Sequence, residues 1–112
     1  MAVTLDDALT NFIAKCALVS AVHDLMTKWR IDLKGGYFLD IYFNGTKGKY
    51  SYTLSQGEQR VLGWDNAPHH PGRSNFPHHF HQADGSILPS KLNGDPDHDL
   101  EIVRIAIEKF LA

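Results

Sequence analysis

Apolar and polar residues alternate along the chain from Trp29 onward, and glycine-containing turns break this alternation at short intervals. Trp29, Ile31 and Leu33 alternate with charged residues, which is the pattern of a strand with one buried face. Further strands are predicted over residues 37–43, 49–54 and 59–64. Turns between the strands are predicted at Gly35-Gly36, Asn44-Gly45 and Gln56-Gly57. The sequence therefore predicts an antiparallel β-meander of four or more strands.

A helix is predicted on each side of this meander. Thr4 and Asp7 form an N-cap pair for the first helix, which covers about residues 5–14. Its apolar residues recur at helical spacing and are Leu5, Ala8, Leu9, Phe12 and Ile13. Asp95 can cap the second helix, and Pro96 suits its first position. The apolar stripe of this helix is Leu100, Val103, Ile107 and Phe110.

Residues 15–26 fit either kind of element. Leu18, Val22 and Leu25 suit a helical stripe, whereas the β-branched residues of the segment favour a strand, which is what we expect here. Together these elements predict the α+β class, with the β-meander packed against the N-terminal and C-terminal helices. A chain of 112 residues is expected to form one domain over residues 1–112.

Composition and charge limit the classes of function. With 43% hydrophobic and 21% charged residues, the chain has the composition of a soluble globular protein rather than a disordered one. A net charge of −2 provides no large basic field of the kind that binds nucleic acid. A small basic group does lie close to the histidines or just before them in sequence: Lys47, Lys49, Arg60 and Arg73.

The cysteine content and the N-terminal sequence indicate the compartment. Cys16 is the only cysteine, which excludes an intramolecular disulfide and a multi-cysteine zinc site, and we expect it to be a small buried apolar residue. The N-terminal residues lack the basic stretch of a signal peptide. Residues 12–22 form an apolar run that is too short to span a bilayer and is interrupted by Lys15. A cytoplasmic protein that does not bind membranes is expected.

Five of the seven histidines lie within Asn66–His81, in the stretch NAPHHPGRSNFPHHFH. Histidine has an unperturbed pKa of about 6.5, so it can serve as an acid, a base or a neutral metal ligand at physiological pH. Three prolines and a glycine within residues 68–77 predict an irregular surface loop whose side chains are held in place. The functional site is therefore predicted in this stretch, whereas His23 and His98 are expected to be ordinary surface residues.

One interpretation of the cluster is acid–base chemistry on RNA without a cofactor. Cleavage requires one group that deprotonates a 2′-hydroxyl and another that protonates a 5′-oxygen, and the histidine pairs can supply both. The candidate catalytic residues are His70, His79 and His81, supported by His69, His78 and Asp65. The candidate substrate-binding residues are Arg60 or Arg73 as a forked phosphate donor, and the aromatic Trp64 and Phe80.

A second interpretation is a site for zinc or another divalent metal. His79 and His81 are two residues apart, so on an extended chain both imidazoles point to the same side and can hold a metal with a third ligand. Candidate third ligands are Asp65, His69, His70 and Asp84. Asp65 has two further possible roles, because its carboxylate can stabilise the turn after its strand or accept a hydrogen bond from a histidine.

Two interpretations involve no chemistry. In the first, the histidines cap backbone groups of the loop and stack on Trp64, Phe76 and Phe80. In the second, the loop of prolines and histidines docks on another protein, so the chain is a binding module. Exposed sheet edges would also be compatible with a homodimer.

Two runs in this stretch resemble a known family. Residues 64–71, WDNAPHHP, and residues 76–81, FPHHFH, resemble the DNAPHHP and PHHxH signature of the TumE family of toxin–antitoxin system proteins. Residues 50–52, YSY, resemble the central strand of that family. The resemblance implies a small intracellular toxin that a DNA-binding antitoxin neutralises. Analogy with other small bacterial toxins implies action on RNA, as a ribonuclease.

The resemblance does not carry over at every position. Members of the family often have a lysine between the last two histidines, where this chain has Phe80. A phosphate-binding role for that position is therefore not expected. The competing functions remain a metal-dependent hydrolase or nuclease that uses His79, His81 and a third ligand, and the binding module without catalysis.

Overall fold

The computed structural model describes residues 4–69, 71–72 and 74–112. They form a seven-stranded sheet in which each strand pairs antiparallel with the next in chain order. The strands are β1 (Val19–Asp24), β2 (Trp29–Leu33), β3 (Tyr37–Asn44), β4 (Lys49–Gln56), β5 (Gln59–Asp65), β6 (His79–His81) and β7 (Ile87–Pro89). A short 3₁₀ turn, η1 (Lys34–Gly36), joins β2 to β3. The predicted antiparallel meander is confirmed.

Helices α1 (Leu5–Lys15) and α2 (Pro96–Phe110) begin where the sequence predicts. The Thr4 hydroxyl accepts a hydrogen bond from the Asp7 amide at 3.2 Å, and the Asp95 carboxylate accepts one from the Asp97 amide at 3.2 Å. Each cap satisfies a backbone donor that has no partner within its own helix. Neither of the two described helices has the length and the apolar run needed to cross a membrane.

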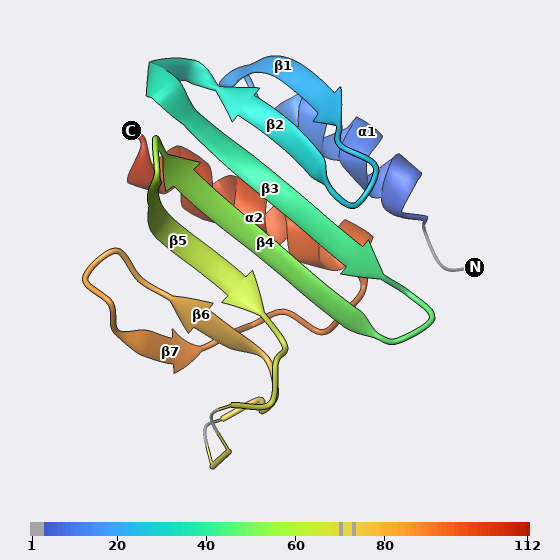
Figure 1. The fold of residues 1–112 in the computed structure, drawn as a ribbon, viewed down its shortest axis with the longest axis vertical. Helices are drawn as coiled ribbons and strands as arrows, with labels where there is room; N and C mark the ends of the chain where they lie inside the picture. The colour runs from blue at the N-terminus through green and yellow to red at the C-terminus, as the bar shows by residue number, and fades with distance from the viewer. Residues whose placement is uncertain (1–3, 70, 73) are drawn as a thin grey trace.

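Both helices lie behind the sheet in Figure 1, and the front face carries no helix. The predicted α+β class is therefore confirmed. The core lies between the helices and the covered face of the sheet, and it includes Leu9 and Phe12 of α1, Val103 of α2, and Ile31 and Tyr52 of the sheet. Because apolar residues of both helices and of four strands, β2 to β5, share this cluster, the sheet and helices form one hydrophobic core.

The stripe of α2 departs from the prediction at its end. Leu100, Val103 and Ile107 are buried, but Phe110 is 40% exposed and is not part of the core. Phe110 is the last residue of the helix, and Leu111, in the C-cap position, packs against the core in its place. The prediction that Phe110 is a core residue was wrong because the chain leaves the helix there.

The ambiguous segment 15–26 contains strand β1, as expected, at one edge of the sheet. Cys16, at the end of α1, is buried as predicted. The connection that Asn44-Gly45 opens is longer than a two-residue turn, since the turn covers residues 45–48. The Asn44 side chain stabilises it by accepting from the Lys47 amide at 3.1 Å.

Strands β6 and β7 were not predicted as strands. Each has three residues, which is too short to show a clear alternation. They form a hairpin that extends the sheet beyond β5, visible at the lower left of Figure 1. The loop that precedes β6 contains neither helix nor strand over its described residues, in agreement with the expected irregular connection.

Candidate active site

Strands β5 and β6 place three of the predicted residues on one face of the sheet. Asp65 lies opposite His79 in the strand register, and His81 follows His79 by two residues. Because side chains alternate between the two faces of a strand, Asp65, His79 and His81 point to the same face. Trp64 and Phe80 point to the other face, where their rings stack 5.0 Å apart and belong to the core or pack against it. The structure therefore does not bring Trp64 and Phe80 together with the histidines.

The Asp65 carboxylate is the centre of this group. Its Oδ1 lies 2.9 Å from His79 Nε2, and its Oδ2 lies 3.2 Å from His81 Nε2. Oδ1 also accepts a hydrogen bond from the Ala67 amide at 3.0 Å. Both roles considered for Asp65 are thus present at once: it stabilises the turn after β5 and it contacts two imidazoles.

His79 is buried, with only 3% of its surface exposed. Its Nδ1 lies 3.0 Å from the backbone oxygen of Pro77. A carbonyl oxygen can only accept, so Nδ1 carries a hydrogen and donates it to Pro77. The other ring nitrogen, Nε2, then faces the Asp65 carboxylate, and a cation or a second proton is needed between the two.

His81 is less buried than His79 and lies across from it, with the two ring centroids 4.7 Å apart and the ring planes at 73°. Burial lowers the pKa of His81, and the positive charge of Arg60 lowers it further, although the Asp65 carboxylate acts in the opposite direction. The ring is therefore held neutral at physiological pH. Neutral His81 donates from Nε2 to Asp65, which assigns the lone pair to Nδ1.

These three residues line a cleft of about 410 Å³ on the face of the sheet that carries no helix. Besides them, the cleft is lined by Tyr42, Lys49, Tyr50, Ser51, Arg60, Ala67 and His69. Two of these side chains, Lys49 and Arg60, are cationic. The cleft thus combines a carboxylate, three histidines and two cations, although the chain as a whole is slightly acidic.

Gly63 makes room for Arg60 beside His81. Gly63 lies opposite His81 in the strand register, and a Cβ atom built on it would lie 3.3 Å from Arg60 Cδ. That distance is closer than ordinary van der Waals contact, so a side chain at position 63 would push the Arg60 stem away. The sequence gives no signal for this contact, because the strand register decides it.

His78 points away from the cleft. Its Nδ1 lies 2.8 Å from the Tyr50 hydroxyl, and its ring stacks on the Tyr50 ring at 5.8 Å. Burial raises the pKa of Tyr50, with the charges of Asp99 and Asp65 adding to the effect, so Tyr50 stays protonated. His78 therefore packs against Tyr50, whose ring is part of the core. The predicted residues His70 and Arg73 lie outside the described residues.

Two asparagines that sequence reasoning did not assign to the site anchor the loop beside it. The Asn66 side chain accepts from the Tyr50 amide at 3.1 Å and donates to the Gly48 carbonyl at 2.7 Å. The Asn75 side chain donates to the carbonyls of Ser90 and Leu92, at 2.7 and 2.9 Å. One end of the loop is thereby fixed to the turn before β4, and the other to the segment before α2.

The described residues contain one group of histidine and carboxylate side chains with the spacing of a metal site, and it is Asp65, His79 and His81. One ligand atom from each lies within 4.8 Å of the others. Asp84, another candidate third ligand, is exposed in the turn between β6 and β7 and accepts from the Ser86 amide and hydroxyl, at 2.8 and 2.6 Å. It is not part of the group.

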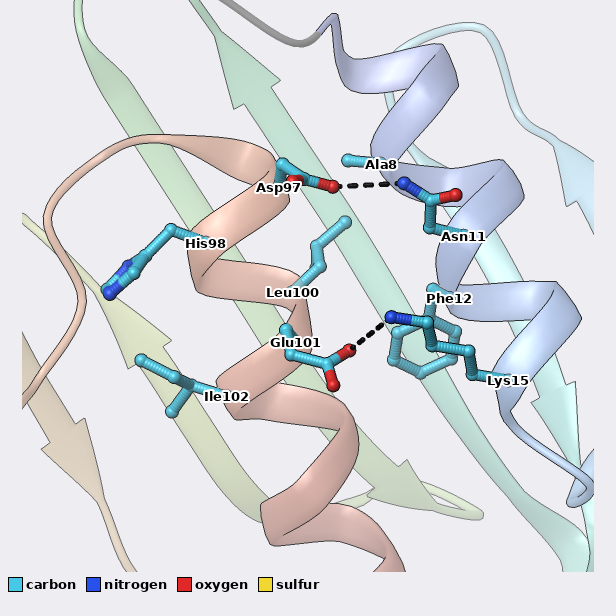
Figure 2. A pocket seen from close by; sticks show the side chains of 9 residues that line it. All are labelled: Ala8, Asn11, Phe12, Lys15, Asp97, His98, Leu100, Glu101 and Ile102. Atoms are coloured by element: carbon cyan, nitrogen blue, oxygen red, sulfur yellow. Dashed lines mark hydrogen bonds and ion pairs between the residues drawn. The ribbon is translucent and has the colours of Figure 1, made fainter.

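Figure 2 shows a second hollow of about 360 Å³, between α1 and α2. Across it, Asn11 donates to Asp97 at 3.1 Å and Lys15 pairs with Glu101 at 3.8 Å, so its polar side chains hold the two helices together. His98 points away from α1 and pairs with Asp99 at 2.9 Å.

The remaining histidine, His23, lies far along the chain from the cluster. It pairs with Asp32 at 2.7 Å. The side chains of His23 and His98 are 47% and 44% exposed, so both are surface residues, as predicted.

Comparison with known proteins assigns the chain to one family. No curated protein and no solved structure shows significant similarity to the chain. The family described as Toxin TumE, however, matches residues 9–111, which is nearly the whole chain and includes every residue of the cleft. The resemblance of the histidine signature to that family is thereby confirmed, and membership implies an antitoxin partner. The chain belongs to the Toxin TumE family and is the toxin of a toxin–antitoxin system.

Proposed function

We propose that this toxin cleaves RNA by metal-free acid–base chemistry in the cleft, and that it acts in the cytoplasm. The observation that carries the proposal is the contact between Asp65 Oδ2 and His81 Nε2, 3.2 Å apart, in a cleft that also holds Lys49 and Arg60. A carboxylate that accepts from one nitrogen of a neutral imidazole leaves the other nitrogen oriented to take a proton. The two cations suit the phosphate group beside the reacting hydroxyl.

In the proposed reaction His81 is the general base. Its Nδ1 takes the proton of a 2′-hydroxyl, and the 2′-oxygen attacks the adjacent phosphorus atom. The bond from phosphorus to the 5′-oxygen of the next nucleotide breaks, and that oxygen takes a proton from His69, the acid. The products are a 2′,3′-cyclic phosphate and a free 5′-hydroxyl. Asp65 stabilises the positive charge that develops on His81 and fixes the orientation of its ring.

Arg60 and Lys49 are the proposed phosphate-binding residues. An arginine offers several N–H donors in a planar fork that matches two phosphate oxygens, and a lysine adds a mobile positive charge. Both line the same cleft as His81, and a Cβ atom built on Gly63, the residue opposite His81 in the strand register, would lie 3.3 Å from Arg60 Cδ. Negative charge that builds up on the phosphate in the transition state is therefore met by donors already in place.

His79 is the proposed positioning residue. Its two ring nitrogens contact Pro77 O and Asp65 Oδ1, at 3.0 and 2.9 Å, and the residue is buried. These contacts hold the Asp65 carboxylate in the orientation that also reaches His81. We therefore assign His79 to the support of Asp65 and His81 to the transfer of the proton.

The proposal is tested by incubating purified, metal-free toxin with a short RNA and analysing the ends of the products. We expect a 2′,3′-cyclic phosphate and a 5′-hydroxyl, and no cleavage at a position where the 2′-hydroxyl is replaced by hydrogen. The matched control is His23→Ala, a surface histidine outside the cleft, which should cleave like the parent. Cleavage at the 2′-deoxy position, or no cleavage of any RNA, would contradict the proposal.

A further inference from the structure

We propose that Asp65, His79 and His81 also form a binding site for a divalent transition-metal ion such as Zn²⁺, and that the ion inhibits the toxin. The binding part of this proposal stands on the geometry of the three residues alone. The inhibitory part rests on the acid–base function proposed above, because the ion and the reaction would use the same side chains.

The first support is the donor set. Two imidazole Nε2 atoms and a carboxylate are ligands that zinc prefers in proteins, and here the ligand atoms converge within 4.8 Å of one another. Bonds of about 2.0–2.2 Å in a tetrahedral arrangement hold neighbouring ligand atoms roughly 3.4 Å apart. Asp65 Oδ1 lies 2.9 Å from His79 Nε2, and Asp65 Oδ2 lies 3.2 Å from His81 Nε2, so a small outward shift of the carboxylate brings each of these pairs to that spacing.

The second support is independent and concerns the far side of the His79 ring. A metal-bound histidine usually donates its other ring N–H to a carbonyl or carboxylate, which fixes the tautomer and the ring orientation. His79 Nδ1 makes that contact with the Pro77 carbonyl at 3.0 Å. Because Nδ1 donates to Pro77, the ring is oriented so that its other nitrogen, Nε2, faces the Asp65 carboxylate.

The third support is the position of the ligands in the fold. Asp65 and His79 face each other on paired strands, so the backbone hydrogen bonds of the sheet hold two of the three ligands in register. His79 is 3% exposed, so little ordering of its side chain remains to be done when a metal binds. The three residues also line the cleft, which leaves the fourth position of a tetrahedral ion accessible from it.

Inhibition is expected because the ion would bind the lone pair of a nitrogen atom of His81, the proposed general base. A metal bound to His81 Nε2 takes the lone pair of that nitrogen, so the ring hydrogen must reside on Nδ1. Nδ1 can then no longer accept the proton of a 2′-hydroxyl. The carboxylate of Asp65, once bound to the ion, is likewise withdrawn from the stabilisation of a charged His81 ring.

The competing explanation of the same contacts is protonation. If His79 carries hydrogens on both nitrogens, it donates to Pro77 and to Asp65 as an imidazolium, and the group is satisfied without a metal. The two explanations differ in one observable quantity, which is whether the metal-free protein takes up an ion at these three residues.

The test is a titration of the metal-free full chain with Co²⁺, read by visible absorption, followed by displacement with Zn²⁺ in a calorimeter. We expect one ion per chain and the intense visible bands of a tetrahedral cobalt site. His79→Ala and Asp65→Asn should each weaken binding by about tenfold or more. His23→Ala and His98→Ala, which remove surface histidines that also pair with a carboxylate, are the matched controls and should bind like the parent.

Thermal unfolding of each variant distinguishes a substitution that removes the metal site from one that prevents folding. Asp65→Asn conserves size and is expected to remain folded, so a loss of cobalt absorption in a folded Asp65→Asn chain supports the site. No ion uptake by the parent, or uptake that Asp65→Asn and His79→Ala leave unchanged, would overturn it. Zn²⁺ should also raise the melting temperature of the parent but not that of the folded Asp65→Asn variant.

The inhibitory part has its own measurement. RNA cleavage by the metal-free toxin should fall when one equivalent of Zn²⁺ is added and return when a chelator removes it. Cleavage that increases with Zn²⁺ while cobalt binds at the three residues would confirm the site and overturn inhibition in favour of a metal-dependent nuclease. If no RNA is cleaved in either state, the acid–base function fails, whereas the cobalt titration still decides whether the site exists.

Discussion

Asp65 is the residue on which the proposed chemistry depends most. One carboxylate contacts the Nε2 atoms of two histidines and accepts from the Ala67 amide, so its orientation is fixed from three sides. A carboxylate held in this way can orient a neutral imidazole and stabilise the same ring once it is protonated. The loss of its charge should therefore lower the reaction rate more than it weakens the binding of RNA.

Asp65→Asn should lower kcat for RNA cleavage by about 10²–10⁴-fold with little change in KM. An amide keeps the size of the side chain but removes the negative charge that stabilises protonated His81. Steady-state kinetics on a short RNA checks this, with Asp84→Asn, an exposed carboxylate in the β6–β7 turn, as the control. A rise in KM alone would show that Asp65 binds substrate and takes no part in the chemistry.

Gly63→Ala should raise KM for RNA several-fold by displacing Arg60. A Cβ atom at this position would lie 3.3 Å from Arg60 Cδ, so the Arg60 side chain must shift by a few tenths of an ångström, and the guanidinium group at its end shifts with it. The matched test is a double-mutant cycle, in which Gly63→Ala should have no further effect once Arg60 is alanine. Independent, additive effects of the two substitutions would show that Gly63 does not act through Arg60.

At this scale the sequence predicts part of the site. The two-residue spacing of His79 and His81 on an extended chain places both rings on one face, and the end of a strand is a natural place for Asp65. The roles of Gly63 and Asn75 could not be predicted, because each depends on a partner distant in sequence or across a strand pair. The strand register decides the contact of Gly63, and the position of the loop before β6 decides the contacts of Asn75, so residue type alone does not predict either.

At the scale of elements, the central strands are joined by charge as well as by backbone hydrogen bonds. The Asp40 carboxylate on β3 accepts two hydrogen bonds from Arg30 on β2, at 2.7 and 3.0 Å, and one from Lys28 at 2.8 Å. The Arg30 guanidinium also lies 4.3 Å from the centre of the Phe38 ring. Asp40 is partly buried, so these contacts are less screened than those of an open surface pair.

Asp40→Asn should destabilise the fold by about 1–2 kcal/mol at neutral pH. Burial alone would raise the pKa of Asp40, but the hydrogen bonds from Arg30 and Lys28 outweigh it and the pKa is lowered. A lowered pKa in the folded state stabilises the fold above the unfolded-state pKa, and this contribution is lost as the pH falls towards the folded-state pKa. The stability difference between Asp40→Asn and the parent should therefore shrink in acid.

Urea unfolding at neutral and acidic pH measures this difference. Glu58→Gln, a substitution of an exposed acidic residue in the turn between β4 and β5, is the control and should have little effect at either pH. A difference between Asp40→Asn and the parent that grows in acid would contradict the assigned direction of the pKa shift.

The sequence predicts the long elements well and the short ones poorly. Strands β2 to β5 and both helices have enough residues to show their period, and their caps and turns are visible as single residues. β6 and β7 have three residues each and belong to the sheet only because they pair with β5 and with each other. Tertiary pairing, rather than local preference, makes them strands.

Across the molecule, the two faces of the sheet have different roles: one face packs in the core and the other carries the cleft. One face is covered by α1 and α2 (Figure 1) and forms the core. The other face carries the cleft with Asp65, His79 and His81. Neighbouring residues of β5 therefore have different roles, since Trp64 packs in the core while Asp65 faces the cleft. Substitutions on the helices should consequently change stability without changing the chemistry of the cleft.

Ile107→Ala should destabilise the fold by about 2–5 kcal/mol, because Ile107 is fully buried between α2 and the sheet and its truncation leaves a cavity. Ile105→Ala, on the same helix at a residue that is 53% exposed, is the matched control and should change stability by about 0.5 kcal/mol or less. Urea unfolding of both variants compares the two sites directly. Equal effects would contradict the assignment of the core to one face of α2.

The RNA cleavage rate of the His81→Ala variant, measured with and without imidazole in solution, shows directly whether His81 transfers the proton. If His81 transfers the proton, the variant should lose most of its activity, and free imidazole should restore part of it by entering the space that the side chain has left. Imidazole should not rescue Arg60→Ala, whose defect is in phosphate binding. A His81→Ala toxin that cleaves RNA at the rate of the parent would contradict the account.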